Sequence, residues 1–166
     1  MYRTELVEKK RYRYRVVLLS FIAAMILMAI PLPEWAVAWR PMWVVLTLIY
    51  WCMALPGQTS VLGIFFIGLI MDVYQDSVFG LNALCLLVIA HVTHRMYAMM
   101  RMFPWHQQAL YVFFILVLYL FIGWLVKVLL GFPPIGSLDY WMPAISSILL
   151  WPWVFVLLRG LRRDFY

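Results

Sequence analysis

The chain has 166 residues, of which 67% are hydrophobic and 12% are charged, whereas soluble domains are about half apolar and about a quarter charged. A water-soluble fold of this size cannot bury so much apolar surface, because small domains have a high ratio of surface to volume. The composition therefore excludes a soluble domain and predicts one membrane domain, residues 1–166, with no separate soluble module.

Basic residues account for the formal net charge of +6, and they gather at the two ends of the chain. Residues 1–15 form a basic N-terminal segment and residues 159–166 form a basic tail. Such clusters beside apolar segments are typical of cytoplasmic flanks that anionic lipids attract, so their placement favours a membrane surface over nucleic acid. The flanking cations are Arg3, Lys9, Lys10, Arg11, Arg13 and Arg15 at one end, and Arg159, Arg162 and Arg163 at the other.

The first apolar segment, residues 16–31, is predicted to be the first transmembrane span. A cleaved signal peptide is the alternative, because residues 16–30 resemble its apolar region and the Ala-Val-Ala sequence at 36–38 resembles a cleavage site. The Pro-Leu-Pro sequence between them and the tryptophan that follows make a poor context for cleavage. We therefore favour an uncleaved signal-anchor.

The next uncharged window, residues 41–71, is too long for one helix, since about 20 residues cross the hydrocarbon core. It contains the sequence Pro56-Gly57-Gln58-Thr59, which is typical of a turn. Division at this turn predicts two short spans, residues 41–55 and 58–72. Both are short for a span, so we expect them to tilt little or to thin the membrane locally.

Three more apolar segments are predicted to span the membrane, at residues 78–95, 106–130 and 141–158. Six spans place both basic ends and the loop carrying Arg95 and Arg101 on one side, which the positive-inside rule assigns to the cytoplasm. Five spans would place the C-terminal cations and that loop outside. The predicted fold is an all-α integral membrane protein, a bundle of six transmembrane helices with both termini cytoplasmic.

Tryptophans near the ends of these segments are typical of the aromatic belt at the headgroup level. Trp35 and Trp39 are four residues apart, so we expect a short interfacial helix that lays both rings into the membrane surface. Trp51 and Trp124 are predicted to lie deeper, between helices or against acyl chains. The predicted belt residues are Trp35, Trp39, Trp43, Trp105, Trp141, Trp151 and Trp153.

Two acids close to one apolar segment are the most informative polar residues. Asp72 directly follows the apolar run, and Asp76 shares a helical face with it if the helix continues. Gly63 and Gly68 precede them, and glycines in membrane helices allow close helix packing. Either the acids form a pair in an outer loop, or Asp72 has a structural or partner-facing role, which we favour.

Other polar residues of the apolar segments have simple interpretations. Lys127 is expected to extend its amine to the interface, and pairing with an acid is the alternative. His91 and His94 are expected to form a polar cytoplasmic edge rather than a metal or haem site. Cys52 and Cys85 are expected to be small buried hydrophobes. No hydrolase, nucleotide-binding or metalloprotease motif occurs, so we expect no catalytic residue, cofactor or metal.

Several short sequence blocks, in this order and spacing, resemble the rod shape-determining protein family MreD in its gammaproteobacterial form. The resemblance covers nearly the whole chain and begins with the basic N-terminus that leads into the first span. The blocks are Trp39-Arg40-Pro41-x-Trp43, Tyr50-Trp51-x-x-Ala54-Leu55-Pro56, Gly68-Leu69-Ile70-Met71-Asp72, Gly80-Leu81-Asn82-Ala83-Leu84, Leu149-Leu150-Trp151-Pro152-Trp153, Leu157-Leu158-Arg159 and Arg162-Arg163.

The resemblance implies a role in the cell-elongation machinery of rod-shaped bacteria. MreD-like proteins lie in the inner membrane with MreC, which spans once, in a complex that connects MreB filaments with the glycan polymerase RodA and its transpeptidase partner. The resemblance also implies a fold similar to the six-helix substrate-binding subunits of energy-coupling-factor transporters.

We therefore expect a non-enzymatic scaffold that works through its membrane-embedded surface. A small-molecule or lipid-binding carrier is the alternative, although few polar groups occur at membrane depth, and an enzyme acting on lipid-linked sugars is a weaker one. The candidate residues for helix packing or partner docking are Gly63, Gly68, Asp72, Asp76, Gly80 and Ala83.

Overall fold

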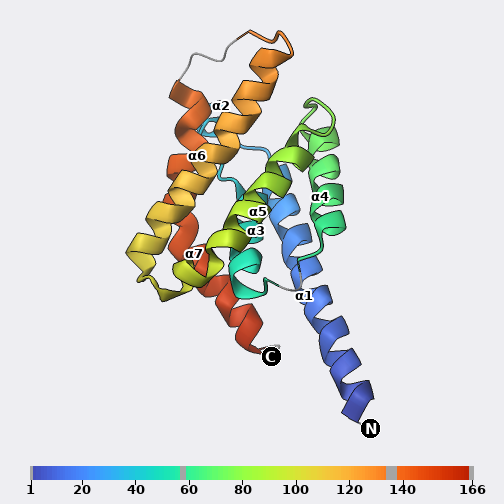
Figure 1. Cartoon of the computed structure of the whole chain (residues 1–166). Coiled ribbons are helices and arrows are strands. Elements are labelled where there is room, and N and C mark those ends of the chain that lie inside the picture. The colour runs from blue at the N-terminus through green and yellow to red at the C-terminus, as the bar shows by residue number, and fades with distance from the viewer. Residues whose placement is uncertain (1, 57–58, 134–137, 165–166) are drawn as a thin grey trace.

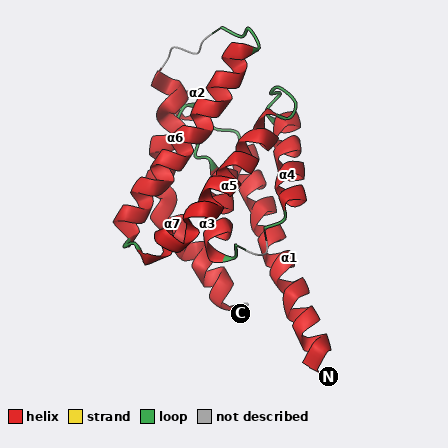
Figure 2. Ribbon diagram, viewed as in Figure 1, coloured by secondary structure: helices red, strands yellow, loops and turns green. Residues whose placement is uncertain are grey.

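A computed structural model describes residues 2–56, 59–133 and 138–164, and the side chains within these ranges except those of residues 2–13, 101, 105 and 164. Every regular element within these ranges is a helix, which confirms the predicted all-α class (Figure 2). The elements are α1 (Tyr2–Ala29), α2 (Glu34–Val37), α3 (Trp43–Ala54), α4 (Val61–Tyr74), α5 (Leu81–Met102), α6 (Trp105–Leu129), the 3-10 helix η1 (Leu138–Trp141) and α7 (Met142–Asp164).

The longer helices alternate in direction along the chain. Helices α1, α4 and α6 run away from the end of the molecule where both termini lie, and α3, α5 and α7 run back toward it (Figure 1). In the described part of the chain, three segments are long and apolar enough to cross a membrane: Leu81–Met100, His106–Leu129 and Leu138–Arg163. Three shorter apolar helices accompany them, at Tyr14–Ala29, Trp43–Ala54 and Val61–Tyr74. These lengths and compositions are those of a membrane protein.

Helix α3 is the centre of the bundle. Every side chain from Val44 to Ala54 is buried, and α1, α5, α6 and α7 surround the helix. With 12 residues it is about 18 Å long, at about 1.5 Å per residue. A hydrogen bond joins α3 to α1 in addition to their packing. The indole Nε1 of Trp51 in α3 donates to Ser20 Oγ of α1 at 2.7 Å.

Arginine and histidine side chains fix two of the turns around α3. Arg40 donates from its two terminal nitrogens to the carbonyl oxygens of Met28, at 3.0 Å, and Ile30, at 3.1 Å. It thereby satisfies carbonyls that the end of α1 leaves without helical partners. His94 of α5 donates from its ring to the carbonyl oxygen of Pro56, in the predicted turn between α3 and α4.

Among the tryptophans whose side chains are described, burial agrees with the prediction for Trp51 and contradicts it for Trp151. Trp35, in the short helix α2, is 81% exposed, and Trp51 is packed between helices as expected. Trp151, predicted to lie in the aromatic belt, is instead almost fully buried. The expectation was wrong because Trp151 lies on the inward face of α7, close to Phe155, which also contacts Tyr50 of α3.

Candidate functional site

The turn from α4 to α5 is organised around the carboxylate of Asp72. This side chain is only 1% exposed, yet its oxygens accept hydrogen bonds of 2.8 Å from Ser77 Oγ, from the backbone N–H of Gly80 and from the backbone N–H of Asn82. Gly80 is the N-cap residue of α5 and Asn82 lies in its first turn, where free N–H groups and the helix dipole favour a negative charge. The buried charge is therefore stabilised by oriented donors.

Asn82 extends this network toward α6. Its Nδ2 donates to Gln75 Oε1 at 3.1 Å and to Ser77 Oγ at 3.3 Å, and its Oδ1 accepts a short hydrogen bond from the hydroxyl of Tyr119. Tyr119 is a buried residue of α6. The network thus joins the end of α4, the start of α5 and the middle of α6.

Replacement of Tyr119 by phenylalanine is expected to lower the free energy of unfolding by about 1–3 kcal/mol, because Asn82 Oδ1 would be left buried without its donor. Tyr111→Phe is the matched control, since among the described residues the Tyr111 hydroxyl donates only to the sulfur of Met99, at 3.8 Å near the surface. Unfolding in mixed micelles with increasing SDS, followed by tryptophan fluorescence, measures both. Equal stability of the two variants would contradict the role given to Tyr119.

Gly68 and Ala83 lie where α4 and α5 are closest. A Cβ atom at Gly68 would lie 2.3 Å from the Cα and 2.6 Å from the backbone nitrogen of Ala83. Real Cβ atoms do not approach backbone atoms so closely, so only glycine permits this crossing. Both residues, predicted as helix-packing candidates, therefore contact each other inside the bundle rather than lie on its surface.

The remaining packing candidates lie elsewhere. Gly63 is exposed in the first turn of α4, where its N–H donates to Ser60 Oγ. Gly80 has a φ of 88° and precedes α5, a left-handed conformation that glycine adopts without strain. Asp76 does not share a helical face with Asp72, because α4 ends at Tyr74 and Asp76 has a φ of 49° in the following turn.

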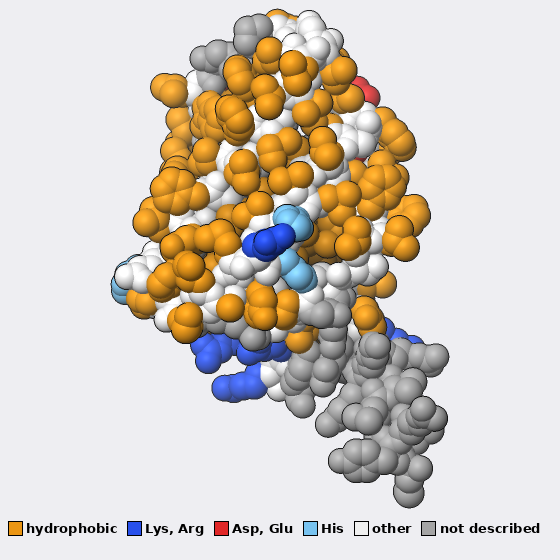
Figure 3. Space-filling model, in the orientation of Figure 1, with side chains coloured by type: hydrophobic (Ala, Val, Ile, Leu, Met, Phe, Trp, Pro, Cys, Tyr) orange, Lys and Arg blue, Asp and Glu red, His pale blue; other side chains and the backbone are white. Residues whose placement is uncertain are grey.

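Basic side chains gather at the end of the molecule that carries the termini (Figure 3). Arg15 and Arg159 are exposed there, together with Arg163, whereas Arg162 is half-buried. The side chains of five other predicted flank residues lie outside the described part of the chain: Arg3, Lys9, Lys10, Arg11 and Arg13.

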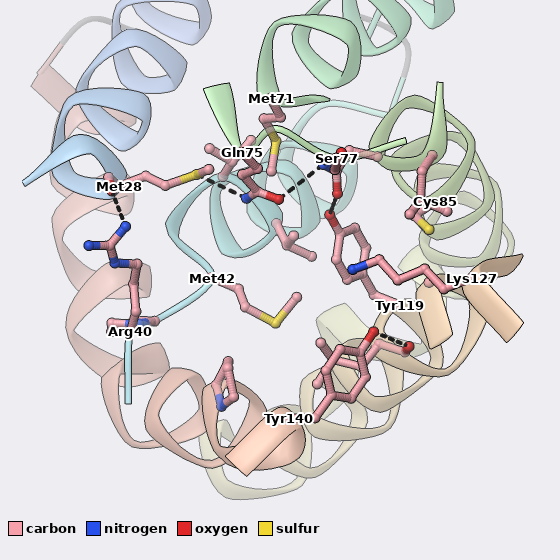
Figure 4. A pocket seen from close by; sticks show the side chains of 18 of the residues that line it. Met28, Arg40, Met42, Met71, Gln75, Ser77, Cys85, Tyr119, Lys127 and Tyr140 are labelled. Atoms are coloured by element: carbon pink, nitrogen blue, oxygen red, sulfur yellow. Dashed lines mark hydrogen bonds between the residues drawn. The ribbon is translucent and has the colours of Figure 1, made fainter. Parts of the chain in front are cut away.

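A cavity of about 270 Å³ lies beside the polar network. Gln75, Asn82 and Tyr119 line it on one side, and Arg40 and Lys127 bring positive charge to it (Figure 4). The ammonium of Lys127 points into the cavity next to Tyr119 (Figure 4), and does not extend to the interface as the sequence predicted. Apolar side chains complete the wall, among them Met28, Met42, Val44, Val45, Leu81 and Leu120.

Sequence reasoning missed the residues that line this cavity as a group. Lys127 was assigned a role at the membrane interface, whereas Arg40 and Asn82 were named only within two separate sequence blocks. One signal was available in the sequence. The amide of Asn82, the phenol of Tyr119 and the amine of Lys127 lie within apolar segments, where polar groups need hydrogen-bonding or charged partners. Within the described residues, no group of three or more histidine, cysteine, aspartate or glutamate side chains is placed to hold a metal ion.

Comparison with known proteins identifies the family. Residues 9–161 match the family described as rod shape-determining protein MreD. A relative from Haemophilus influenzae, named "Rod shape-determining protein MreD", is 33% identical over 151 residues, which cover 89% of this chain and 90% of that protein. The chain belongs to the MreD family. The family match includes Asp72 and its partners, Gly68 with Ala83, and both cations of the cavity.

Membership of the MreD family connects this helical membrane protein with rod shape determination. The resemblance inferred from the sequence blocks is thereby confirmed. No solved structure matches the chain.

Proposed function

We propose that this MreD-family protein is a non-enzymatic scaffold of the bacterial cell-elongation complex. In this role it docks MreC and links MreB to the glycan synthase, RodA with its transpeptidase partner, and so supports lateral peptidoglycan synthesis. One observation carries the proposal: the polar groups of the α4–α5 turn are hydrogen-bonded to one another, while large apolar side chains cover much of the molecular surface. The membrane-embedded surface is then the part available to partners.

The proposed topology has six crossings, with both termini on the cytoplasmic side of the inner membrane. The alternating helix directions (Figure 1) and the basic side chains beside the termini (Figure 3) support it, since cytoplasmic flanks carry an excess of arginine and lysine. The short helices α3 and α4 cross the membrane packed against neighbouring helices of the bundle. This arrangement is also the basis for proposing a likeness to the energy-coupling-factor binding subunits.

A groove between α1 and α7 is the proposed docking face for the single span of MreC. Its volume is about 530 Å³, and its floor includes Thr47 of α3. Small side chains of α1 line one wall, namely Ser20, Ala23 and Ala24. Without a hydrophobic force between helices in lipid, small residues favour association because they let a partner helix approach closely.

Ala23→Trp tests this face, because the exposed Ala23 lines the groove and an indole there would occupy the space of the partner helix. We expect the variant to reduce recovery of MreC in co-purification by about tenfold, equivalent to about 1.4 kcal/mol of binding free energy. Cells that depend on the variant should lose rod shape. Leu84→Trp, on the exposed face of α5, is the matched control and should retain MreC.

Two outcomes contradict the proposal at different levels. If Leu84→Trp loses MreC while Ala23→Trp retains it, the docking face is not the groove. If the unmodified protein fails to recover MreC from membranes in which both are produced, the scaffold function is wrong. Equal amounts of monodisperse protein after purification ensure that misfolding does not explain either result.

A further inference from the structure

One buried hydrogen-bond donor of the cavity beside the polar network has no acceptor among the described residues. Arg40 uses its terminal nitrogens on the carbonyls of Met28 and Ile30, but its Nε is buried and has no partner among the described residues. Gln75, whose side chain is exposed, donates from Nε2 to the sulfur of Met28 at 3.8 Å, which is a weak acceptor. A buried donor without an acceptor is costly, so the site favours a ligand that supplies acceptor oxygens.

The positive charge of the cavity is also uncompensated. Arg40 and Lys127 are its charged lining residues, and no carboxylate is among the described residues that line it. The nearby carboxylate of Asp72 is hydrogen-bonded to Ser77, Gly80 and Asn82, and its single negative charge balances at most one of the two cations. Neither cation forms an ion pair within the part of the chain that is described. A bound anion would therefore replace the missing negative charge.

Shape and composition restrict the kind of anion. Arg40 and Lys127 approach the cavity from opposite sides (Figure 4), and the volume of about 270 Å³ is below the range of about 300–1,000 Å³ typical of drug-sized ligands. It suits a headgroup-sized moiety rather than a large molecule. Apolar wall residues, including Met42, Val44 and Leu120, lie beside the polar ones, so the same ligand can place carbon atoms against them.

We propose that this cavity binds a phosphate group, held between Arg40 and Lys127, with the adjoining carbon skeleton against the apolar wall. Arginine and lysine both bind phosphate oxygens well. The phosphate belongs either to a membrane lipid that enters from the bilayer or to a soluble phosphate compound. The site requires no contact with MreC and is independent of the proposed docking function.

Thermal unfolding of the purified full-length protein in a neutral maltoside detergent tests the proposal, with intrinsic tryptophan fluorescence as the readout. The probes are phosphatidylglycerol, phosphatidylcholine, oleate and inorganic phosphate. We expect phosphatidylglycerol or inorganic phosphate to raise Tm by about 4 °C at saturation, because a ligand that binds only the folded state stabilises it. A shift with the lipid alone assigns a lipid headgroup, and a shift with inorganic phosphate assigns a soluble ligand.

Lys127→Gln should raise the half-saturating concentration by about tenfold or more, because it removes a charge-assisted contact to phosphate. Lys127→Arg should restore binding, and Arg163→Gln, which removes an exposed charge at the opposite end of the molecule, should leave it unchanged. The second readout is native mass spectrometry, in which the unmodified protein and Lys127→Arg retain a phosphate-containing adduct that Lys127→Gln loses.

Four outcomes would overturn the inference. Equal shifts with phosphatidylcholine and phosphatidylglycerol would show that negative charge is not recognised. A Lys127-dependent shift with oleate but not with the phosphate probes would assign the cavity to carboxylates. Equal binding by Lys127→Gln and Arg163→Gln would place the anion elsewhere, for instance on the basic flank. The absence of any shift or adduct in the unmodified protein would mean that no phosphate binds.

Discussion

Gly68→Ala is expected to force α4 away from α5 and to lower the free energy of unfolding by about 3 kcal/mol, at the upper end of the usual cost of overpacking. The added Cβ would lie 2.3 Å from Ala83 Cα, and a backbone atom in the first turn of α5 cannot move aside as the tip of a side chain can. The displacement would also disturb the hydrogen bonds from Gly80 and Asn82 to Asp72, since these donors are in the same turn.

Gly63→Ala is the matched control on the same helix. A Cβ at Gly63 would meet only Ser60, with its nearest atom at an ordinary 3.6 Å, and alanine is more favourable than glycine in a helix by about 1 kcal/mol. We therefore expect a neutral or slightly stabilising effect. SDS-induced unfolding in mixed micelles measures both variants, and equal destabilisation of the two would show that the α4–α5 crossing is looser than its geometry indicates.

Asp72→Asn is expected to lower the free energy of unfolding by about 3 kcal/mol, although the two side chains have nearly the same size. The aspartate oxygens accept from three donors. An asparagine would turn its amide NH2 toward at least one of them, leaving donors to face each other in a buried site, where hydrogen bonds to a charged group contribute about 1.5–3 kcal/mol each. The favourable interaction between the carboxylate and the start of α5 would also be lost.

The neighbouring acid provides the control for this charge effect. Asp76 is exposed and has a φ of 49°, a backbone conformation that asparagine also tolerates. Asp76→Asn should therefore leave the stability within about 0.5 kcal/mol of the unmodified protein, as is usual for surface substitutions. If both variants are equally stable, the Asp72 carboxylate does not hold the α4–α5 turn. If Asp72→Asn is destabilised, the proportion of round cells should increase as the amount of folded protein decreases.

The positions of the helices could be predicted because charges and turn residues interrupt the apolar segments. Pro56 and Gly57 divide one long apolar window, and helices α3 and α4 lie on either side of that division. The sequence could not show that α3 is enclosed by other helices, because an apolar side chain is suited equally to lipid and to a protein interior. The position of Trp151 was predicted wrongly for the same reason. The sequence shows how far Trp151 is from the end of its apolar segment, but not which face of α7 carries it.

The candidate site was predictable only where it is local in sequence. Asp72 and Gly80 are eight residues apart, and the glycine and acid blocks identified this turn as important. The cavity is different, because Arg40, Asn82 and Lys127 come from three distant segments and meet only when the helices pack. Lys127 illustrates the limit well. A lysine near the end of an apolar helix ordinarily reaches the interface, and only the neighbouring helices determine that it turns inward.

The enclosure of α3 has a consequence for the order in which the protein is made. Helix α3 is synthesised early, but three of the helices that surround it, α5, α6 and α7, follow later in the chain. A nascent chain that has released only α1 to α4 therefore holds a helix whose final neighbours do not yet exist, and lipid or the insertion machinery must cover it meanwhile. The bundle closes only when its last helix leaves the ribosome, so a stop codon before α7 exposes the centre of the protein rather than merely shortening its end.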